Sequence, residues 1–329
     1  MTTRLRTRVD RRRFLALVPI GFVPSAWAQF NRAVPVTLIV PFGAGGSIDT
    51  IARGLAEGMS LALGVPVIVD NRAGASGAIG AAAAARAAPD GRTLFLGAST
   101  TQVVLPNVST RLAYDPLRDF TPISMVAEVE NALVVHPSIP ARTVAEFVAY
   151  CKANAGKVAF GSSGVGGITH LAGELFKTAA GVDAVHVPYK SSSAVDLDLI
   201  GGQIQFAFAT LASALPHIQS GKMRALALAS EKRSTFLPGV PTTAEAGYPS
   251  VVAVSWAALY GPAKLDPALV ARFNAAAGAA LRRPELVKHF ESLVTRALPS
   301  TPAELTSYQA RDYAKWGRVV AKAGIRLES

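Results

Sequence analysis

The sequence of 329 residues has only one cysteine, Cys151, and five histidines. A single thiol cannot build a disulfide framework or a cysteine-based zinc site. The histidines lack the short spacings of metal ligands, so we predict neither a metal site nor a cofactor. Charged residues are also scarce, at 17% against 50% hydrophobic residues, which excludes a disordered chain. The length predicts a packed globular protein of about two domains.

Positive charge is concentrated at the N-terminus. Residues 1–28 hold six arginines and one aspartate, so their removal would lower the formal net charge from +11 to +6. The remaining basic residues form no cluster of five and are not interleaved with aromatic residues. This distribution argues against a nucleic-acid partner.

The same N-terminal segment has the pattern of an export signal. An apolar run over 14–23 follows the arginines and ends in Ala26-Trp27-Ala28, a small-residue cleavage pattern. The run is too short and too broken to span a membrane. Arg11-Arg12-Arg13-Phe14-Leu15 resembles a twin-arginine signal, but Asp10 stands where Ser or Thr is usual. We therefore predict a cleavable signal over 1–28 with the export route open, and an uncleaved basic tail as the alternative.

Strand and helix patterns alternate along the rest of the chain. The expected strands cover residues 36–40, 65–69, 93–96, 158–160, 184–187, 204–209 and 225–229. The expected helices cover residues 48–59, 79–88, 168–176, 193–200, 211–219, 267–281, 284–293 and 302–323. Apolar strands that alternate with helices predict mostly parallel sheets flanked by helices, the α/β class.

Two apolar segments separate the two groups of strands. Residues 131–136 and 251–259 are bounded by prolines, and we interpret them as crossing strands that form a hinge. The fold predicted is two-lobed, with residues 29–131 and 252–329 in lobe 1 and residues 132–251 in lobe 2. Two crossings predict a cleft whose opening angle can change.

Each lobe offers a strand, a glycine-rich turn and a helix start, at Gly45–Asp49 and Gly164–His170. A helix N-terminus leaves backbone N–H groups unpaired, carries partial positive charge and is a natural anion site. Neither loop contains Lys or Arg, so recognition would depend on N–H groups, hydroxyls and water. Residues 188–193 could add Lys190 or a hydroxyl group. The alternative is two ordinary turns in which Asp49 caps its own helix and His170 is a hydrogen-bonding residue.

Enzyme motifs are incomplete. The stretch from Gly43 begins like G-x-G-x-x-G but ends in Ile48, no P-loop is present, and residues 161–164 do not match a nucleophile elbow. We therefore predict no catalytic residue. The alternative from another class is an exported hydrolase with Ser162 or Ser163 as nucleophile and His170 as base.

Short motifs recur in a fixed order over about residues 34–325. They are Leu38-Ile39-Val40-Pro41-Phe42 with Gly45-Gly46-Ser47 and Asp49, Val69-Asp70-Asn71-Arg72-Ala73-Gly74-Ala75, Ala87-Ala88-Pro89-Asp90-Gly91, Tyr114-Asp115-Pro116-Leu117 with Asp119-Phe120, His170-Leu171-Ala172-Gly173-Glu174-Leu175-Phe176, Val185-His186-Val187-Pro188-Tyr189-Lys190, Ala214-Leu215-Pro216-His217-Ile218, Gly239-Val240-Pro241-Thr242, Ala244-Glu245-Ala246-Gly247 and Lys315-Trp316. Together they resemble the Bug family of extracytoplasmic solute receptors, the binding components of tripartite tricarboxylate transporters.

This resemblance implies a periplasmic binding fold of type II that closes on a small organic acid, a mono- or dicarboxylate. It also implies periplasmic location, membrane transporter subunits of the tripartite type as partners, and a monomeric state. A receptor that feeds a signalling system is the alternative to transport. The predicted ligand-binding residues are Phe42, Gly43, Ala44, Gly45, Gly46, Ser47, Asp49, Ser99, Thr100, Ser162, Ser163, Gly164, Gly167, Thr169, His170, Pro188, Tyr189, Lys190, Ala209 and Thr210.

Two departures from the family pattern bear on the ligand. Gly43-Ala44 stand where many members carry proline, which keeps the first loop rich in glycine. Ala209-Thr210 stand where many members have an acidic residue. The second departure favours a carboxylate that lacks a cationic amine.

Overall fold

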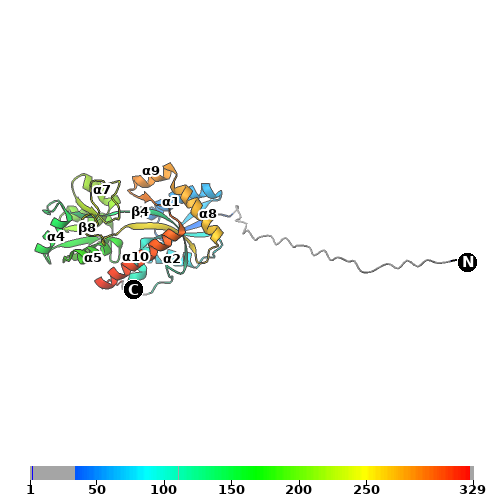
Figure 1. Ribbon diagram of the computed structural model, residues 1–329, viewed down its shortest axis with the longest axis horizontal. Coiled ribbons are helices and arrows are strands. Elements are labelled where there is room, and N and C mark those ends of the chain that lie inside the picture. The colour runs from blue at the N-terminus through cyan, green and yellow to red at the C-terminus, as the bar shows by residue number, and fades with distance from the viewer. Residues whose placement is uncertain (1, 3–33, 110, 327–329) are drawn as a thin grey trace. The chain divides into compact units, whose positions relative to one another are not determined.

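The computed structural model describes residues 2, 34–109 and 111–326 (Figure 1). The predicted signal segment, apart from residue 2, lies outside these described residues. Among the described residues, no helix combines the length and the hydrophobicity that a membrane span needs. The strands form two sheets, and each sheet is covered by its own helices. We name these two units the first and the second lobe.

The first lobe contains a six-stranded sheet in the order β11-β4-β10-β3-β1-β2. Its strands are β1 (Val36–Val40), β2 (Val67–Asn71), β3 (Thr93–Ala98), β4 (Phe120–Val129), β10 (Ser255–Pro262) and β11 (Arg296–Ala297). Its helices are α1 (Ser47–Leu63), η1 (Ala75–Gly77), α2 (Ala78–Ala85), η2 (Thr100–Val104), α3 (Leu105–Val108), α8 (Pro267–Leu281), α9 (Pro284–Ser292) and α10 (Pro302–Ala323).

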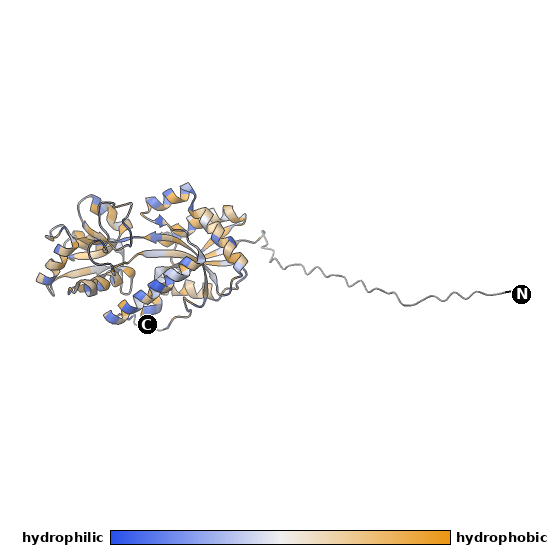
Figure 2. Ribbon diagram, viewed as in Figure 1, coloured by the Kyte–Doolittle hydropathy of each residue, from blue (hydrophilic) through white to orange (hydrophobic). Residues whose placement is uncertain are grey.

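The second lobe contains a five-stranded sheet in the order β7-β6-β8-β5-β9. Its strands are β5 (Asn131–Val135), β6 (Ala159–Ser162), β7 (Val185–Pro188), β8 (Phe206–Thr210) and β9 (Arg224–Leu228). Its helices are α4 (Val144–Ala153), α5 (Ile168–Ala180), α6 (Ser192–Ile200) and α7 (Leu211–Gln219). The strands of both sheets are largely hydrophobic (Figure 2), as strands covered by helices require.

The two-lobed α/β fold class is confirmed, but the expectation of mostly parallel sheets is wrong in detail. Only β1–β2, β1–β3, β6–β7 and β6–β8 are parallel pairs. Strands β3 and β8 run towards the crossing between the lobes, whereas β10 and β5 start there and run away from it. Each crossing strand must therefore pair antiparallel with its neighbours. The lobe boundaries expected at residues 131/132 and 251/252 stay a prediction.

The hinge also differs from the expected pair of crossing strands. Residues 131–135 belong to β5 in the second sheet, and β10 in the first sheet begins only at Ser255. The chain crosses first at Glu130, between β4 and β5, and returns through residues 229–254. A strand is assigned to a sheet by its hydrogen bonds, which the apolar pattern alone does not specify.

Asn131 ties the two crossing segments together. Its side chain is fully buried, and Nδ2 donates to the carbonyl oxygen of Ala253 at 2.7 Å. The N–H of Ala229 donates to the backbone oxygen of Asn131, and the N–H of Ala253 donates to the oxygen of Ala229. Both crossings are thereby held side by side.

Helix α10 closes one side of the first lobe. Within the core, Nε1 of Trp256 donates to Oδ2 of Asp312 at 2.9 Å, and the hydroxyl of Tyr260 donates to Oε1 of Gln309 at 3.1 Å. The predicted packing of this helix on the first lobe is confirmed, and α10 also contacts α5 of the second lobe.

We expect Asn131→Ala to lower the free energy of unfolding by about 1–3 kcal/mol, because the buried oxygen of Ala253 would lose its partner. Urea unfolding followed by circular dichroism measures this difference. Gln203→Ala, which removes an exposed amide of the second lobe, is the control and should stay within about 0.5 kcal/mol of the wild type. Equal effects of the two changes would show that the hydrogen bond of Asn131 across the hinge contributes nothing to the free energy of unfolding.

Candidate functional site

The glycine-rich loop of the first lobe is held by the side chain of Asp49. Gly45 has φ +82°, a left-handed conformation that favours glycine, and Gly46 precedes the first residue of α1 with extended backbone. The N–H of Gly45 donates to Oδ2 of Asp49 at 2.8 Å. This hydrogen bond folds the loop back onto the helix and leaves Gly46 and Ser47, at the start of α1, exposed.

The second lobe repeats this arrangement with a different acceptor. Gly166 has φ +74°, Gly167 precedes α5 with extended backbone, and the N–H of Gly166 donates to Nδ1 of His170 at 3.0 Å. In both loops the acceptor stands four residues after the left-handed glycine. Two unrelated side chains, an aspartate and a histidine, therefore serve the same purpose.

These loops leave the first N–H groups of both helices available. The N–H groups of Gly46, Ser47 and Ile48 have no acceptor among the described residues, and the same holds for Ile168 and Thr169. Free N–H groups at the positive end of a helix dipole favour a negatively charged ligand. The geometry therefore gives each lobe one potential anion-binding helix start.

Asp49 is a supporting residue with a strongly lowered pKa. A hydrogen bond from Arg53 Nε at 2.9 Å is the main cause, and Gly45 N–H and Asn71 Nδ2 also donate to the carboxylate. These donors outweigh the effect of burial and lower the pKa of Asp49 to about 2. Its oxygens are already occupied, so Asp49 shapes the loop.

His170 and His186 form a neutral stacked pair behind the second loop. Their ring centroids lie 3.7 Å apart. Burial, with the charges of His186 and Lys177 as lesser causes, lowers the pKa of His170 to about 3. Burial likewise lowers the pKa of His186 to about 4. Both rings are therefore uncharged at neutral pH.

The alternative of a serine hydrolase named His170 as the base, but the histidine that contacts Ser162 is His186. Nε2 of His186 lies 2.7 Å from Oγ of Ser162, whereas Nδ1 of His170 accepts the N–H of Gly166. Ser162 and His186 are far apart in the sequence, which hid this contact. They meet because β6 and β7 are adjacent strands. Ser162 is only 1% exposed, and its hydroxyl also donates to the oxygen of Gly164. These contacts make Ser162 part of the loop framework.

A cleft of about 340 Å³ lies at the second loop and receives residues from both lobes. Its lining residues are Phe42, Ser76, Thr100, Val104, Leu105, Ser163, Gly164, Val165, Gly166, Gly167, Ile168, Thr169, Thr210 and Ser255. Thr100 and Val104 belong to η2, a single π-helical turn that follows β3. Such turns are frequent at functional sites because they redirect side chains within a helix.

The structure brings only part of the predicted set to this cleft. Phe42, Thr100, Ser163, Gly164, Gly167, Thr169 and Thr210 line it. Gly43, Ala44, Gly45, Gly46 and Ser47 are exposed and do not line it, while Asp49, His170 and Ser99 are buried supports, Ser99 accepting from the N–H of Trp256. Ser162 and Ala209 line a small adjoining chamber, and Pro188, Tyr189 and Lys190 lie outside the cleft lining. Their roles in binding stay predictions.

No sequence pattern pointed to three polar side chains that lie near the cleft. Ser76 and Ser255 line the cleft, and Asp196 of α6 lines the small chamber with Ser162 and Thr210. Asp196 is 3% exposed, and its Oδ1 has no hydrogen-bond partner among the described residues. Burial raises its pKa, which favours the neutral acid. No group of three or more metal-ligating side chains occurs among the described residues.

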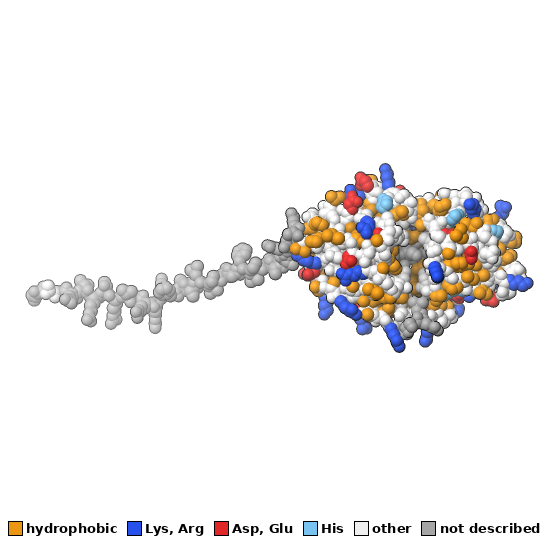
Figure 3. Space-filling model, turned by 180° about the vertical axis from the view of Figure 1, so that it is seen from behind, with side chains coloured by type: hydrophobic (Ala, Val, Ile, Leu, Met, Phe, Trp, Pro, Cys, Tyr) orange, Lys and Arg blue, Asp and Glu red, His pale blue; other side chains and the backbone are white. Residues whose placement is uncertain are grey.

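One face of the molecule carries charges of both signs. On the face shown in Figure 3, Lys and Arg side chains are scattered, with acidic side chains among them. The lining of the cleft contains no lysine or arginine, so the groups there that can attract an anion are N–H and hydroxyl groups.

A two-lobed α/β fold with a cleft between the lobes is typical of solute-binding receptors. The chain belongs to one family of that class: the family model described as tripartite tricarboxylate transporter family receptor matches residues 51–325. The resemblance found in the motifs is thereby confirmed.

Relatives support the same assignment along almost the whole chain. The protein BugT of Bordetella pertussis is 37% identical over 322 residues, which cover 96% of this chain and 99% of that protein. A solved structure of R. palustris Rpa4515 with adipate has 32% identity, a TM-score of 0.75, and coverage of 89% and 98% of the two chains. MatC from Rhodopseudomonas palustris with bound malate has 30% identity, a TM-score of 0.71, and coverage of 87% and 98%.

We expect Asp49→Asn to destabilise the protein by about 2 kcal/mol at neutral pH, because an amide cannot accept all three hydrogen bonds. Since the folded pKa lies near 2, below the ordinary 3.8, the carboxylate stabilises above 3.8 and loses this effect as the pH falls towards 2. Urea unfolding at several pH values should show the two proteins converging over that range. Glu57→Gln, an exposed acid on the same helix, is the control; a constant gap would contradict the assigned role of Asp49.

Proposed function

We propose that this protein is a periplasmic receptor that binds a small mono- or dicarboxylate in the cleft and delivers it to a membrane transporter of the tripartite type. The observation that carries the proposal is the pair of matched helix starts, with Gly45–Asp49 in one lobe and Gly166–His170 in the other. Family membership and the adipate and malate in two similar structures agree with it.

The proposed ligand contacts follow from which groups remain unpaired. The N–H groups of Ile168 and Thr169 lie at the cleft and would bind one carboxylate. The hydroxyl of Ser163, which shares a hydrogen bond with Oγ1 of Thr169, would support them. On the opposite side, Thr100 and Phe42 belong to the first lobe. The exposed N–H groups of Gly46 and Ser47 would reach the ligand when the lobes close, in the manner of other hinged receptors.

Asp196 is compatible with an anionic ligand. An ionised carboxylate next to the cleft would repel an organic acid, and burial of Asp196 raises its pKa, which reduces this repulsion. A neutral carboxylic acid donates a hydrogen bond, which suits a second carboxylate or a hydroxyl group of the ligand.

We propose no catalytic activity. The imidazole of His186 is the base nearest to Ser162, yet its pKa of about 4 makes it a weak proton acceptor. Ser162 is buried away from the main cleft and already bound to Gly164.

A monomer that presents both lobes to membrane subunits is the state that fits this function.

Calorimetric titration of residues 29–329 tests the proposal directly. We expect at least one of acetate, lactate, succinate, malate and adipate to bind, while glucose and zinc ion do not. Binding of glucose or zinc ion together with no binding of any acid would refute the proposed ligand class.

Two glycine variants test the location of the site. Gly46→Leu and Gly167→Leu should each weaken acid binding at least about tenfold, or about 1.4 kcal/mol, by covering the helix N–H groups. Neither change strains the backbone, because a Cβ at these positions lies 3.6 and 3.4 Å from its nearest neighbour and neither φ is left-handed. Gly239→Leu, an exposed position with open space, is the matched control. Unchanged affinity in both site variants would mean that the ligand binds elsewhere.

A further inference from the structure

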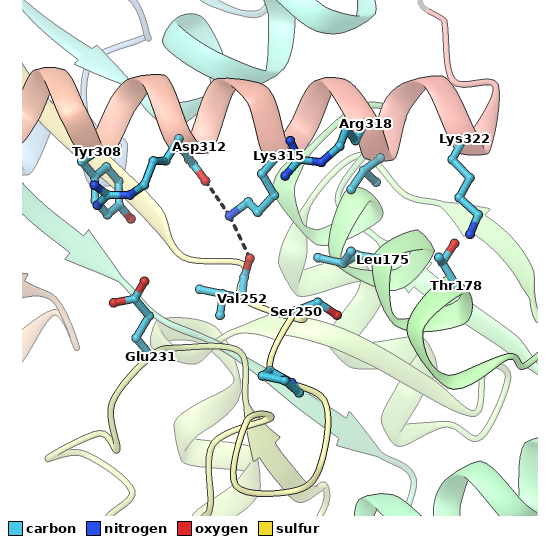
Figure 4. A pocket seen from close by; sticks show the side chains of 13 residues that line it. Leu175, Thr178, Glu231, Ser250, Val252, Tyr308, Asp312, Lys315, Arg318 and Lys322 are labelled. Carbon is cyan, nitrogen blue, oxygen red and sulfur yellow. Dashed lines mark hydrogen bonds and ion pairs between the residues drawn. The ribbon is translucent and has the colours of Figure 1, made fainter.

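A second hollow, of about 460 Å³, lies between α10 and the second lobe (Figure 4). One wall is the face of α10 from Tyr308 to Lys322. The other consists of Leu175 and Thr178 on α5 and the crossing segment from Pro249 to Val252. We name it the α10 groove; none of the residues predicted for acid binding lines it.

Four cations follow one face of α10 at the groove. Arg311, Lys315, Arg318 and Lys322 are spaced by three or four residues, which places them on the same side of a helix. Figure 4 shows Lys315 between Asp312 and the backbone of Val252, to whose oxygen its Nζ donates at 2.9 Å. Lys315 is therefore a neutralised part of the wall.

The other three cations remain available. The side chains of Arg311, Arg318 and Lys322 are exposed and have neither an ion pair nor a hydrogen bond within the part of the chain that the structure describes. Glu231 is the one further acid in the lining and stands on the opposite wall. The groove thus has an excess of positive charge towards the C-terminal end of α10.

Apolar side chains accompany this charge. Leu175, Val252 and Val319 also line the groove. A ligand that fits would therefore offer both carboxylates and apolar groups. Arginines beside an apolar patch are typical of protein interfaces.

We propose that the α10 groove binds an extended, acidic segment of a partner protein. Arg311 and Lys322 are eleven residues apart, or about 16 Å along a helix. A small dicarboxylate is too short to reach both ends, whereas an extended peptide that advances about 3.3 Å per residue spans them with about five residues. Tyr308 is the groove's aromatic residue and is mostly covered, which leaves no stacking platform for nucleic acid.

The groove and the cleft are mechanically connected. Ser255 lines the cleft, and Val252, three residues earlier, lines the groove, so one crossing segment separates the two hollows. A change in the angle between the lobes alters both. If the proposed function holds, the acid and the acidic segment must affect each other's affinity by the same factor.

Fluorescence anisotropy with residues 29–329 and a fluorescein-labelled peptide of sequence Glu-Leu-Glu-Glu-Leu-Glu-Glu tests the groove. We expect binding that weakens with salt, and at least a tenfold loss in the triple variant Arg311→Gln, Arg318→Gln, Lys322→Gln. The control Lys152→Gln, Lys157→Gln, Lys222→Gln removes the same charge from exposed lysines of the second lobe. Absence of binding, an equal loss in both variants, or displacement of the peptide by millimolar phosphate would overturn the proposal.

A second arm separates this proposal from the function of the cleft. Saturation with the acid found by calorimetry should change the peptide's affinity at least threefold, while the triple variant binds that acid like the wild type. An unchanged peptide affinity would refute the connection between the hollows. If no acid binds at all, the proposed function fails, but the peptide measurement still decides whether the groove binds an acidic segment.

Discussion

The candidate site depends on one short contact made twice: a side chain accepts the N–H of a left-handed glycine four residues before it. In the first lobe Asp49 holds Gly45, and in the second His170 holds Gly166. Each contact turns the loop so that the following helix presents unpaired N–H groups. Without it the glycine-rich turns would have no fixed direction, because glycine adopts many conformations at little cost.

The two acceptors differ in charge, and their surroundings suit that difference. Asp49 is ionised, with Arg53 and Asn71 as partners, whereas His170 is kept neutral by burial against His186. Neither acceptor therefore adds a net charge that competes with an anion at the helix start. The attraction for a carboxylate comes from the backbone, which explains how a cleft without lysine or arginine can suit an acid.

The crossing between the lobes determines where the cleft and the hinge lie. Strands β3, β6 and β8 bring their loops to the crossing, and β5 and β10 leave from it, so the cleft and the hinge share one region. The side chain of Asn131 joins the two crossings. The same geometry places the α10 groove behind the returning segment, where a partner could sense the angle between the lobes.

Sequence patterns predicted the two lobes and both helix starts, because glycine runs and apolar periodicity are local. They missed β4, whose apolar run contains Pro122 and Glu128, and α4, although Thr143 and Glu146 form a capping box. They also missed contacts made by folding: His186 on Ser162, Asp196 beside Thr210, and the basic face of α10, whose members are separated in sequence. The share of parallel strand pairs was overestimated, because the direction of a strand depends on how the chain crosses between the lobes.

The most direct test of the account is a ¹⁵N–¹H correlation spectrum of the mature protein titrated with the acid found to bind. The account predicts that the largest shifts occur at the amides of Gly46, Ser47, Ile168 and Thr169, in both lobes and with the same apparent affinity. Shifts confined to one loop, or centred on α10, would contradict binding by two matched helix starts.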